Sequence, residues 1–297
     1  MASRIAIDRH SGHPVTPRPA LTPGFGDTFR LTLLTNDPAL ALKADHAGVD
    51  RIGIDLERLG KAQRQAGLDT RLSGHTIDDL AAVAGKLARA EAFVRVNPLN
   101  TDTEWEVDAV LEAGAQVLML PFFQTATEVR KFVSIVGGRA RIVILLETTA
   151  AAIRVREIVS VPGLDEVMIG LNDLRLQFGV RSHFEVLSSP LLDALAQEVR
   201  RAKLALSVGG VARTDDTSLP VPPDLVFAQF PRLGATGAWI ARSFFRDTPP
   251  DWDFDDAIAS LRQRLTEWAS ASPKTLEKTR DQLAGSASRV TFQIRPD

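Results

Sequence analysis

The stretch at 141–179, RIVILLETTAAAIRVREIVSVPGLDEVMIGLNDLRLQFG, constrains the fold of this chain most strongly. Its apolar, β-branched run at 142–146 is typical of a strand buried on both faces, and the run ends at Glu147. A helical segment at 150–159 follows, and a second strand at 166–169 leads to Asp173. The carboxyl ends of parallel strands share one edge of a sheet, where α/β folds bind their ligands. The sequence therefore predicts that Glu147 and Asp173 meet at that edge.

Two carboxylates at one sheet edge suit a hard cation. The chain has no Cys and only five His, so the available oxygen ligands favour Mg²⁺ or Mn²⁺ over zinc, with another divalent metal as the alternative. A structural interpretation also stays open. An acidic residue after a strand is often a solvated loop residue, and Asp173 could serve as a helix N-cap.

Composition narrows the class of protein. The 297 residues are 44% hydrophobic and 24% charged, which is typical of a globular domain. The 35 basic and 37 acidic residues nearly balance, and because no basic block stands out, nucleic acid is not an expected partner. The absence of Cys excludes disulfides, thiolate metal sites and a Cys nucleophile. No apolar run is long enough for a membrane span, and no signal peptide is evident, so we expect a soluble cytoplasmic protein without a membrane partner.

Strands and helices alternate along the chain. The predicted strands cover 30–35, 51–55, 92–96, 117–120, 142–146, 166–169, 204–208 and 225–230, and the last of them is followed by a helix at 235–245. Eight strands that are each followed by a helix indicate an α/β fold of the (β/α)₈ TIM barrel type, with an additional C-terminal helix. A doubly wound open sheet is the alternative, although no Gly-rich dinucleotide turn is present.

The predicted domain boundaries follow from this count. We expect an irregular N-terminal arm at 1–28, a catalytic barrel at 29–248, and a C-terminal helix and tail at 249–297. The helix predicted at 251–269 lies outside the barrel count, so it could cap the bottom of the barrel or pack on a neighbouring subunit.

In a barrel, the residues that follow the strands share one mouth. They are Asp55, Glu57, Arg95, Asn97, Gln124, Glu147, Asn172, Asp173 and Gln229. An Arg that faces two metal-binding carboxylates suits a 2-oxo acid: the metal chelates the carbonyl and carboxylate oxygens, and the Arg lies where negative charge grows as an enolate forms. A salt bridge at the barrel rim is the alternative role for Arg95. No Lys ends a strand, which disfavours Schiff-base chemistry.

Several motifs resemble those of a known family. They are IDLE at 54–57, VRVN at 94–97, GAQVLMLP at 114–121, LET at 146–148 and IGLNDL at 169–174. In order and spacing, the chain resembles the HpcH/HpaI aldolase / citrate lyase family of metal-dependent class II pyruvate aldolase-like enzymes, over roughly 30–246. The resemblance implies a (β/α)₈ barrel, often with its eighth helix exchanged between subunits, and a homo-oligomer, commonly a trimer or hexamer.

The resemblance also implies roles for individual residues. Glu147 and Asp173 would hold Mg²⁺ or Mn²⁺, and Arg95 would stabilise a pyruvate-like enolate. The backbone of Gly170, Leu171 and Asn172 would line the carboxylate of the 2-oxo acid substrate. Glu57 would position or activate a metal-bound water.

One departure concerns the catalytic base. Aldolase members carry an acidic residue followed by His after strand two, whereas Glu57 is followed here by Arg58. Three alternatives stay open: His75 folds back to act as the base, Glu57 acts through a metal-bound water, or the base is absent. The intervening loop is basic because it contains Arg58, Lys61, Arg64 and Arg71. Lys61 in particular is predicted to bind an anionic substrate such as a phosphate, a sugar acid or CoA, although a solvated basic loop has the same composition.

Three functions follow from these observations. The first is a metal-dependent carbon–carbon lyase or aldolase that acts on a small-molecule 2-oxo acid through a pyruvate-like enolate. The second is a lyase or thioesterase of a β-hydroxyacyl-CoA thioester, for which the basic loop leaves room. The third is a barrel that has lost catalysis and serves as a binding subunit, an alternative suggested by the missing Glu-His pair.

Overall fold

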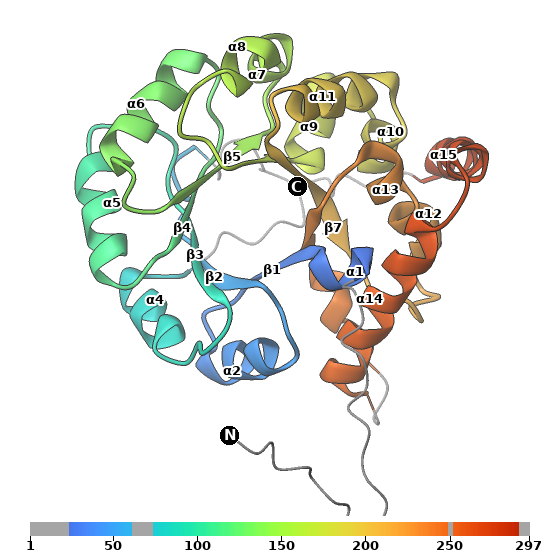
Figure 1. The fold of residues 1–297 in the computed structure, drawn as a ribbon, viewed down its shortest axis with the longest axis horizontal. Coiled ribbons are helices and arrows are strands. Elements are labelled where there is room, and N and C mark those ends of the chain that lie inside the picture. The colour runs from blue at the N-terminus through green and yellow to red at the C-terminus, as the bar shows by residue number, and fades with distance from the viewer. Residues whose placement is uncertain (1–23, 61–73, 249–251, 291–297) are drawn as a thin grey trace, which may run out of the picture.

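The computed structural model describes residues 24–60, 74–248 and 252–290, and in these ranges parallel strands close into an eight-stranded barrel (Figure 1). Each strand pairs with the next along the chain, and β8 returns to β1. The strands are β1 Arg30–Leu34, β2 Arg51–Asp55, β3 Glu91–Arg95, β4 Val117–Leu120, β5 Arg141–Leu146, β6 Glu166–Ile169, β7 Ala205–Val211 and β8 Gly237–Ile240. The (β/α)₈ barrel predicted from the sequence is confirmed.

Helices surround the barrel (Figure 1). They are α1 Phe25–Thr28, α2 Pro38–His46, α4 Ile77–Ala84, α5 Thr103–Glu112, α6 Ala126–Val136, α7 Thr149–Ile153, α8 Val155–Val159, α9 Leu171–Phe178, α10 His183–Leu187, α11 Pro190–Arg201, α12 Pro223–Phe227, α13 Gln229–Leu233, the 3₁₀ helix η1 Arg242–Phe245, α14 Phe254–Ala269 and α15 Pro273–Ala287. Local sequence sets the ends of many of them. At α6, for example, the Thr125 side chain accepts a hydrogen bond from the backbone N–H of Glu128, and Gly137 ends the helix at a left-handed φ of 60°. In the described ranges, no helix has the length and apolar character needed to cross a bilayer.

The last strand differs from the prediction. Residues 225–230, predicted as the eighth strand, form parts of α12 and α13, and β8 lies within the segment 235–245 that was predicted as a helix. The misassigned run is apolar because Phe227 and Phe230 are buried on one side of these short helices, and a short apolar run does not distinguish a strand from a buried helix. Gly237 begins the true strand, β8, where the backbone of β1 approaches closely. A Cβ at Gly237 would lie 2.9 Å from the carbonyl oxygen of Arg30 on β1, so a residue without a side chain fits this position.

The segment predicted to hold one C-terminal helix and a tail contains two helices. The first, α14, packs against α1, α2 and α12 of the same chain. It lies between α2 and α12 in the ring of helices that surrounds the barrel (Figure 1). The Arg262 guanidinium of α14 donates to the carbonyls of Gly26, Phe29 and Gly48, which joins the two ends of the barrel sequence. The second helix, α15, packs against α10, α12 and α13. Residues 25–28 of the predicted arm form α1.

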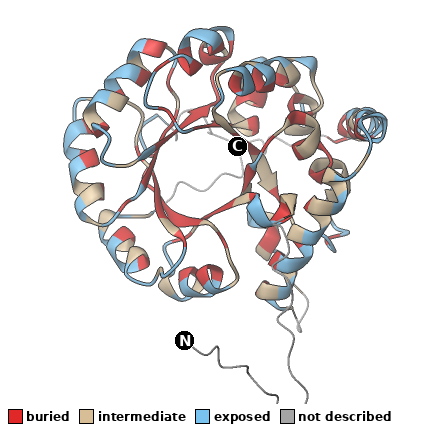
Figure 2. Ribbon diagram, viewed as in Figure 1, coloured by how far each residue is buried: buried red, intermediate tan, exposed pale blue. Residues whose placement is uncertain are grey.

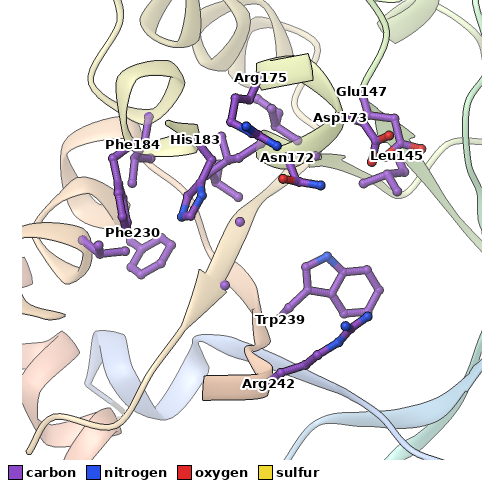
Figure 3. Close-up of a pocket in the computed structure, with 18 of the residues that line it drawn as sticks. Leu145, Glu147, Asn172, Asp173, Arg175, His183, Phe184, Phe230, Trp239 and Arg242 are labelled. Atoms are coloured by element: carbon purple, nitrogen blue, oxygen red, sulfur yellow. The ribbon is translucent and has the colours of Figure 1, made fainter. Parts of the chain in front are cut away.

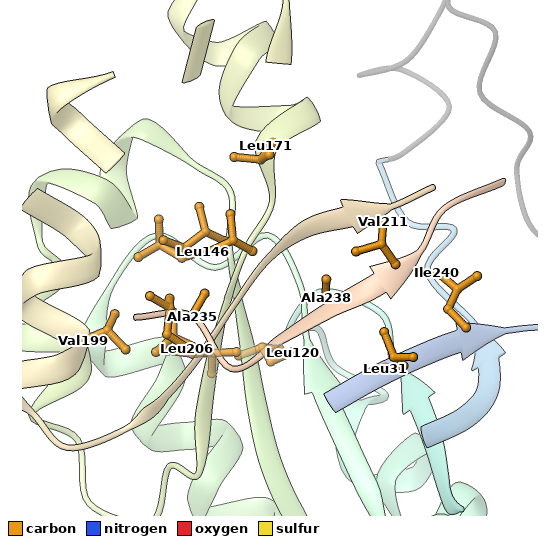
Figure 4. Packing of buried hydrophobic residues seen from close by; sticks show 14 of the residues in the cluster. Leu31, Leu120, Leu146, Leu171, Val199, Leu206, Val211, Ala235, Ala238 and Ile240 are labelled. Atoms are coloured by element: carbon orange, nitrogen blue, oxygen red, sulfur yellow. The ribbon is translucent and has the colours of Figure 1, made fainter. Parts of the chain in front are cut away.

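Two apolar layers stabilise the barrel. The larger lies between the strands and the helices, where side chains such as Leu146 on β5, Val199 on α11 and Leu206 on β7 pack together (Figures 2 and 4). The smaller fills the barrel interior, and its members are Phe93, Val117, Met119, Val143, Leu145 and Met168. Below this layer, the carboxylate of Glu166 is buried among Arg30, Arg51 and Ser207. The interior of the barrel is therefore filled by side chains.

Candidate active site

Arg95 lies at the centre of the mouth. It ends β3 and stands in register with Asp55, which ends β2. The Arg95 Nε donates to Asp55 Oδ1 at 2.8 Å, and the Nη2 donates to Asp55 Oδ2 at 2.6 Å. Its Nη1 lies 3.4 Å from Oε2 of the buried Glu57, and its guanidinium carbon lies 6.0 Å from the ring centre of Trp239. These contacts hold the guanidinium in one orientation at the end of the barrel.

The electrostatics keep Arg95 charged. Burial by itself lowers the pKa of Arg95, but the carboxylates of Asp55, Glu57 and Glu147 outweigh burial and raise the pKa above its ordinary value. The predicted rim salt bridge is present, and its partner Asp55 lies within the mouth. Arg95 therefore presents a fixed positive charge to the cavity that it lines with Glu147 and Asp173.

A second set of hydrogen bonds holds the chain that follows β2. The Asn97 Oδ1 accepts from the backbone N–H groups of Arg58 and Leu59, at 2.9 and 3.1 Å. The Asn97 Nδ2 donates to Glu106 on α5 at 2.7 Å. Burial raises the pKa of Glu106, and its hydrogen bonds to Asn97 oppose that effect. Asn97, which the sequence placed at the mouth, thus anchors the segment that carries Glu57.

Glu147 and Asp173 line the same cavity, as their positions after adjacent strands predict. Glu147 is buried, and its Oε1 accepts a hydrogen bond from the backbone N–H of Phe122 at 3.1 Å. Phe122 has a φ of 50°, an uncommon conformation for a residue with a side chain. The structure contradicts the N-cap interpretation of Asp173, because Gly170 is the N-cap of α9 and Asp173 lies in its first turn.

Gly170 provides the space for Glu147. A Cβ at this position would lie 2.8 Å from the Cβ of Glu147 and 2.9 Å from its Oε2. The first backbone N–H groups of α9 belong to Leu171 and Asn172, and such groups have no acceptor within their own helix. The turn from β6 into α9 therefore brings two carboxylates and a pair of helix N-terminal amides to one cavity wall.

His75 lies at the mouth beside Asp55, although the long loop separates the two residues in the sequence. Its Nδ1 accepts the backbone N–H of Asp55 at 3.0 Å. It lines a second hollow of ≈ 840 Å³ that also includes Asn36, Asp55 and Arg95. Of the three alternatives for the base, the one in which His75 folds back is compatible with this position. The next residue, Thr76, caps α4 together with Asp79.

The cavity beside Glu147 and Asp173 has a volume of ≈ 610 Å³. Figure 3 shows Arg175, Asn172, Asp173 and Glu147 above the open space, His183 beside it, and Trp239 and Arg242 below it. Burial, together with the smaller effect of the neighbouring Arg175, lowers the pKa of His183 to about 4, so His183 is neutral at pH 7.

Sequence reasoning missed four of these residues, namely Arg175, His183, Trp239 and Arg242. A Ser182-x-x-Glu185 capping box does begin α10, and this signal could have placed His183 at a helix start. Trp239 and Arg242 had no such signal, because they lie in the segment whose strand was misassigned.

Two predicted mouth residues, Gln229 and Gln124, do not join the site. Gln229 is fully buried and donates from its Nε2 to the carbonyl of Leu225, so its placement at the mouth is wrong. Gln124 is exposed beside the start of α6. Lys61 lies outside the described residues, as do Arg64 and Arg71 of the same loop.

The residues present fit a divalent metal with few protein ligands. Within the described ranges, no group of three or more His, Cys, Asp or Glu side chains could hold a metal, so Glu147 and Asp173 would be the only protein donors. Mg²⁺ is commonly bound by one or two carboxylates, with substrate and water oxygens completing its shell. The space that Gly170 leaves at Glu147 Oε2 is consistent with such a shared site.

Comparison with known proteins identifies the family. Residues 29–213 match the family of HpcH/HpaI aldolases and citrate lyases. The chain belongs to this family. Family membership places the protein among lyases and aldolases, and it confirms the resemblance seen in the motifs.

Individual relatives carry a more specific name. A hydroxypyruvate/pyruvate aldolase of Sagittula stellata is 32% identical, over 38% of this chain and 56% of that protein. A hydroxypyruvate/pyruvate aldolase of Paraburkholderia phytofirmans is 25% identical, over 72% of this chain and 89% of that protein. The first match thus spans little more than half of its relative.

Solved structures agree with the fold. An HpcH/HpaI aldolase from Desulfitobacterium hafniense has a TM-score of 0.54 at 19% identity, over 72% of this chain and 86% of that one. A citrate lyase from Burkholderia xenovorans has a TM-score of 0.57 at 14% identity, over 90% of this chain and 86% of that one. At this level of identity, the likeness concerns the barrel alone.

Proposed function

We propose that this protein is a divalent-metal-dependent aldolase that makes or breaks a carbon–carbon bond next to a 2-oxo acid, through a pyruvate-like enolate. One observation carries the proposal: Arg95 at the end of β3, Glu147 after β5 and Asp173 after β6 line one cavity. An oriented cation beside two carboxylates is an arrangement suited to the charge that develops on an enolate oxygen. The hydroxypyruvate/pyruvate aldolase relatives support the same class of donor substrate.

Glu147 and Asp173 would hold the metal, with Mg²⁺ or Mn²⁺ as the expected ion. When bound, the metal supplies Lewis-acid polarisation of the substrate carbonyl and orients the 2-oxo acid. The amides of Leu171 and Asn172 begin α9, and the N-terminus of a helix favours an anionic group. We therefore assign the substrate carboxylate to the wall formed by Gly170, Leu171 and Asn172.

Arg95 stabilises the enolate oxygen. Its guanidinium is held by Asp55 before substrate arrives, so little reorganisation is needed as negative charge grows. Glu57 is buried and lies 3.4 Å from Arg95 Nη1. We therefore propose that Glu57 positions Arg95, in place of the water-activating role that the sequence suggested.

His75 is our candidate for a hydrogen-bond donor to the reacting oxygen. A neutral imidazole that accepts at Nδ1 carries its proton on Nε2. In the addition direction, the Nε2–H would donate a hydrogen bond to the aldehyde oxygen as the new C–C bond forms, and a water molecule supplies the proton that completes the C4 hydroxyl. In the cleavage direction, water takes the C4 hydroxyl proton, the same Nε2–H stabilises the alkoxide oxygen, the C3–C4 bond breaks, and the electron pair remains on the enolate.

A titration with oxalate, an analogue of the pyruvate enolate, tests the proposal. We expect oxalate to bind in the presence of Mg²⁺ or Mn²⁺, and binding to disappear in Asp173→Ala and Glu147→Ala. Circular dichroism should show that both variants keep the fold. Metal-independent binding, or binding that both variants retain, would contradict the assigned site. Absence of binding with every metal would redirect the search to a CoA thioester substrate or to a binding role.

A further inference from the structure

Two neighbouring segments of the barrel mouth hold Glu147 in place. The first is the chain that follows β4, because the backbone N–H of Phe122 donates to Glu147 Oε1 at 3.1 Å. The second is the start of α9, where Gly170 leaves room beside Oε2. Glu147 is only 2% exposed, and Figure 3 shows it with Asp173 at one edge of the cavity. The backbone at Phe122 therefore helps to set the position of this carboxylate.

The local sequence explains why the Phe122 N–H reaches a side chain. The β4–β5 pairing extends to Leu120, which stands opposite Ile144. The next residue is Pro121, which has no N–H and cannot donate to a further rung of the ladder. Phe122 thus carries the first backbone N–H beyond the strand, and the Glu147 carboxylate accepts it.

A second hydrogen bond joins the same two segments in the opposite direction. The Thr148 hydroxyl donates to the carbonyl of Phe123 at 2.9 Å. The same hydroxyl accepts from the backbone N–H of Ala151 at 3.0 Å, and so caps α7. Thr148 and Phe123 are both buried. Two successive residues of each segment, 122–123 and 147–148, are therefore linked across the mouth.

The backbone of Phe122 is strained. Its φ of 50° lies in the left-handed region, where the Cβ of an ordinary residue crowds the following carbonyl. In the described ranges, Lys203 and Asp247 are the other residues with a side chain that have a positive φ. Such strain persists where surrounding contacts hold the backbone, and it is concentrated at functional sites. At Phe122, the two hydrogen bonds to the segment after β5 supply contacts of this kind.

We infer that the left-handed turn at Phe122, clamped by Thr148, is a positioning device for the proposed metal ligand Glu147. The turn holds Oε1 on the Phe122 N–H and directs Oε2 towards the Gly170 turn that leads to Asp173. Phe122 and Thr148 are positioning residues, since neither lines the cavity. Groups that orient a metal ligand in this way raise its affinity for the ion. The inference rests on the proposed function, because it takes Glu147 to bind the metal.

Two substitutions of Phe122 separate its backbone from its ring. Phe122→Gly and Phe122→Val both remove the ring, but glycine adopts the left-handed conformation readily and the β-branched valine resists it. We expect Phe122→Val to bind Mn²⁺ about tenfold more weakly than wild type, and Phe122→Gly to remain within about threefold of wild type. Electron paramagnetic resonance of free Mn²⁺ measures these affinities without substrate or turnover. Equal losses in the two variants would overturn the inference.

Thr148 provides an independent test. Thr148→Val removes the hydroxyl and should weaken Mn²⁺ binding by about fivefold, the usual effect of one hydrogen bond. Thr148→Ser keeps a hydroxyl and should restore the wild-type affinity. Because Thr148→Val also removes the cap of α7, the control is Ser272→Ala, which removes the cap of α15. This control should leave the Mn²⁺ affinity unchanged.

Lys203→Val is the matched control for backbone strain. Lys203 is exposed, has a φ of 59°, and lies between α11 and β7, at the end of the barrel opposite the mouth. Urea unfolding without metal should show that Lys203→Val and Phe122→Val are both less stable than wild type, because valine resists this conformation at either position. Only Phe122→Val should lose Mn²⁺ affinity. An equal loss of Mn²⁺ affinity in both would show a general loosening of the barrel and reject the positioning role.

Glu147→Ala separates this inference from the proposed function. Wild type should bind Mn²⁺, and Glu147→Ala should bind it at least about tenfold more weakly. If Mn²⁺ binding depends on Glu147 but keeps its wild-type affinity in Phe122→Val and Thr148→Val, the inference alone is rejected. If wild type does not bind Mn²⁺, or if Glu147→Ala binds it as wild type does, the metal site of the proposed function is rejected, and the inference with it.

Discussion

The guanidinium of Arg95 and the carboxylate of Asp55 form a two-point ion pair across the ends of β3 and β2, with N–O distances of 2.8 and 2.6 Å. Register alone brings these residues together, since Asp55 stands opposite Arg95 in the β2–β3 pairing. The pair fixes the guanidinium of the proposed enolate site before any ligand binds.

Replacing Asp55 with Asn should therefore lower kcat by about ten- to a hundredfold, because a neutral amide holds the guanidinium less firmly and transition-state charge is then less well stabilised. Steady-state kinetics of pyruvate addition measures the effect. The control is Asp108→Asn, which weakens an exposed 2.6 Å ion pair between Asp108 on α5 and Arg139 just after α6. This variant should leave kcat unchanged. Equal rates in wild type and Asp55→Asn would contradict the positioning role.

Gly170→Ala should weaken metal-dependent oxalate binding by at least about tenfold. The added methyl would lie 2.8 Å from the Cβ of Glu147, so the Glu147 side chain must move. Gly285→Ala is the matched change on α15, where a Cβ meets nothing within 4 Å. Isothermal titration measures the affinity of both variants for oxalate in the presence of metal. An unchanged affinity in Gly170→Ala would show that metal-dependent binding does not need the observed position of Glu147.

His75→Asn should reduce kcat for aldol cleavage by about 10²- to 10³-fold, as is typical for loss of a hydrogen-bond donor to a developing oxyanion. The Asn side chain can still accept the backbone N–H of Asp55, so the segment should remain in place. His46→Asn on the outer helix α2 serves as the control, because His46 is exposed and pairs only with Asp255 among the described residues. A kcat within threefold of wild type would leave His75 without a catalytic role.

His183 should make the protein less stable in acid. Burial, with Arg175 nearby, lowers the pKa of His183 from 6.5 to about 4, so between these values the unfolded chain binds a proton that the folded chain does not. The stability contributed by the neutral His183 is complete above pH 6.5 and is lost as the pH falls towards 4. The loss is at most about 3 kcal/mol, at 1.36 kcal/mol for each pKa unit.

Urea unfolding of wild type and His183→Leu at pH 4.5 and pH 7 measures this contribution. The variant should show the smaller decrease in unfolding free energy. Glu106, whose pKa is raised, is present in both proteins and cancels from the comparison. Identical pH dependence in the two proteins would exclude His183 as the source.

Glu166→Gln should lower the unfolding free energy by about 3–5 kcal/mol, because it leaves the buried Arg51 without its main counter-charge. Glu91→Gln is the milder control, since Glu91 is partly exposed and lies 3.4 Å from Arg51. Denaturant titration gives both values. Oxalate binding at the mouth should be unaffected, because Glu166 lies at the opposite end of the barrel.

Much of the barrel could be predicted from local sequence. The first seven strands are short, largely apolar runs, and the sequence predicted their positions to within a few residues. The eighth strand was misassigned, because the apolar residues Leu225, Phe227 and Phe230 belong to short helices that pack on the core. In β8, Ala238 is buried and Trp239 faces the mouth, so Trp239 and Arg242 were missed with the strand.

The sequence by itself determined which carboxylates follow which strands, because strand order and chain direction place Glu147, Asp173 and Arg95 at one end of any parallel barrel. Only the tertiary structure decided how these groups are oriented. The pairing of Asp55 with Arg95, the return of His75 across the loop, and the anchoring of Glu147 by Phe122 depend on contacts between residues that are distant in the chain. No local propensity encodes such contacts, since their geometry is set by strand register and by the packing of neighbouring elements.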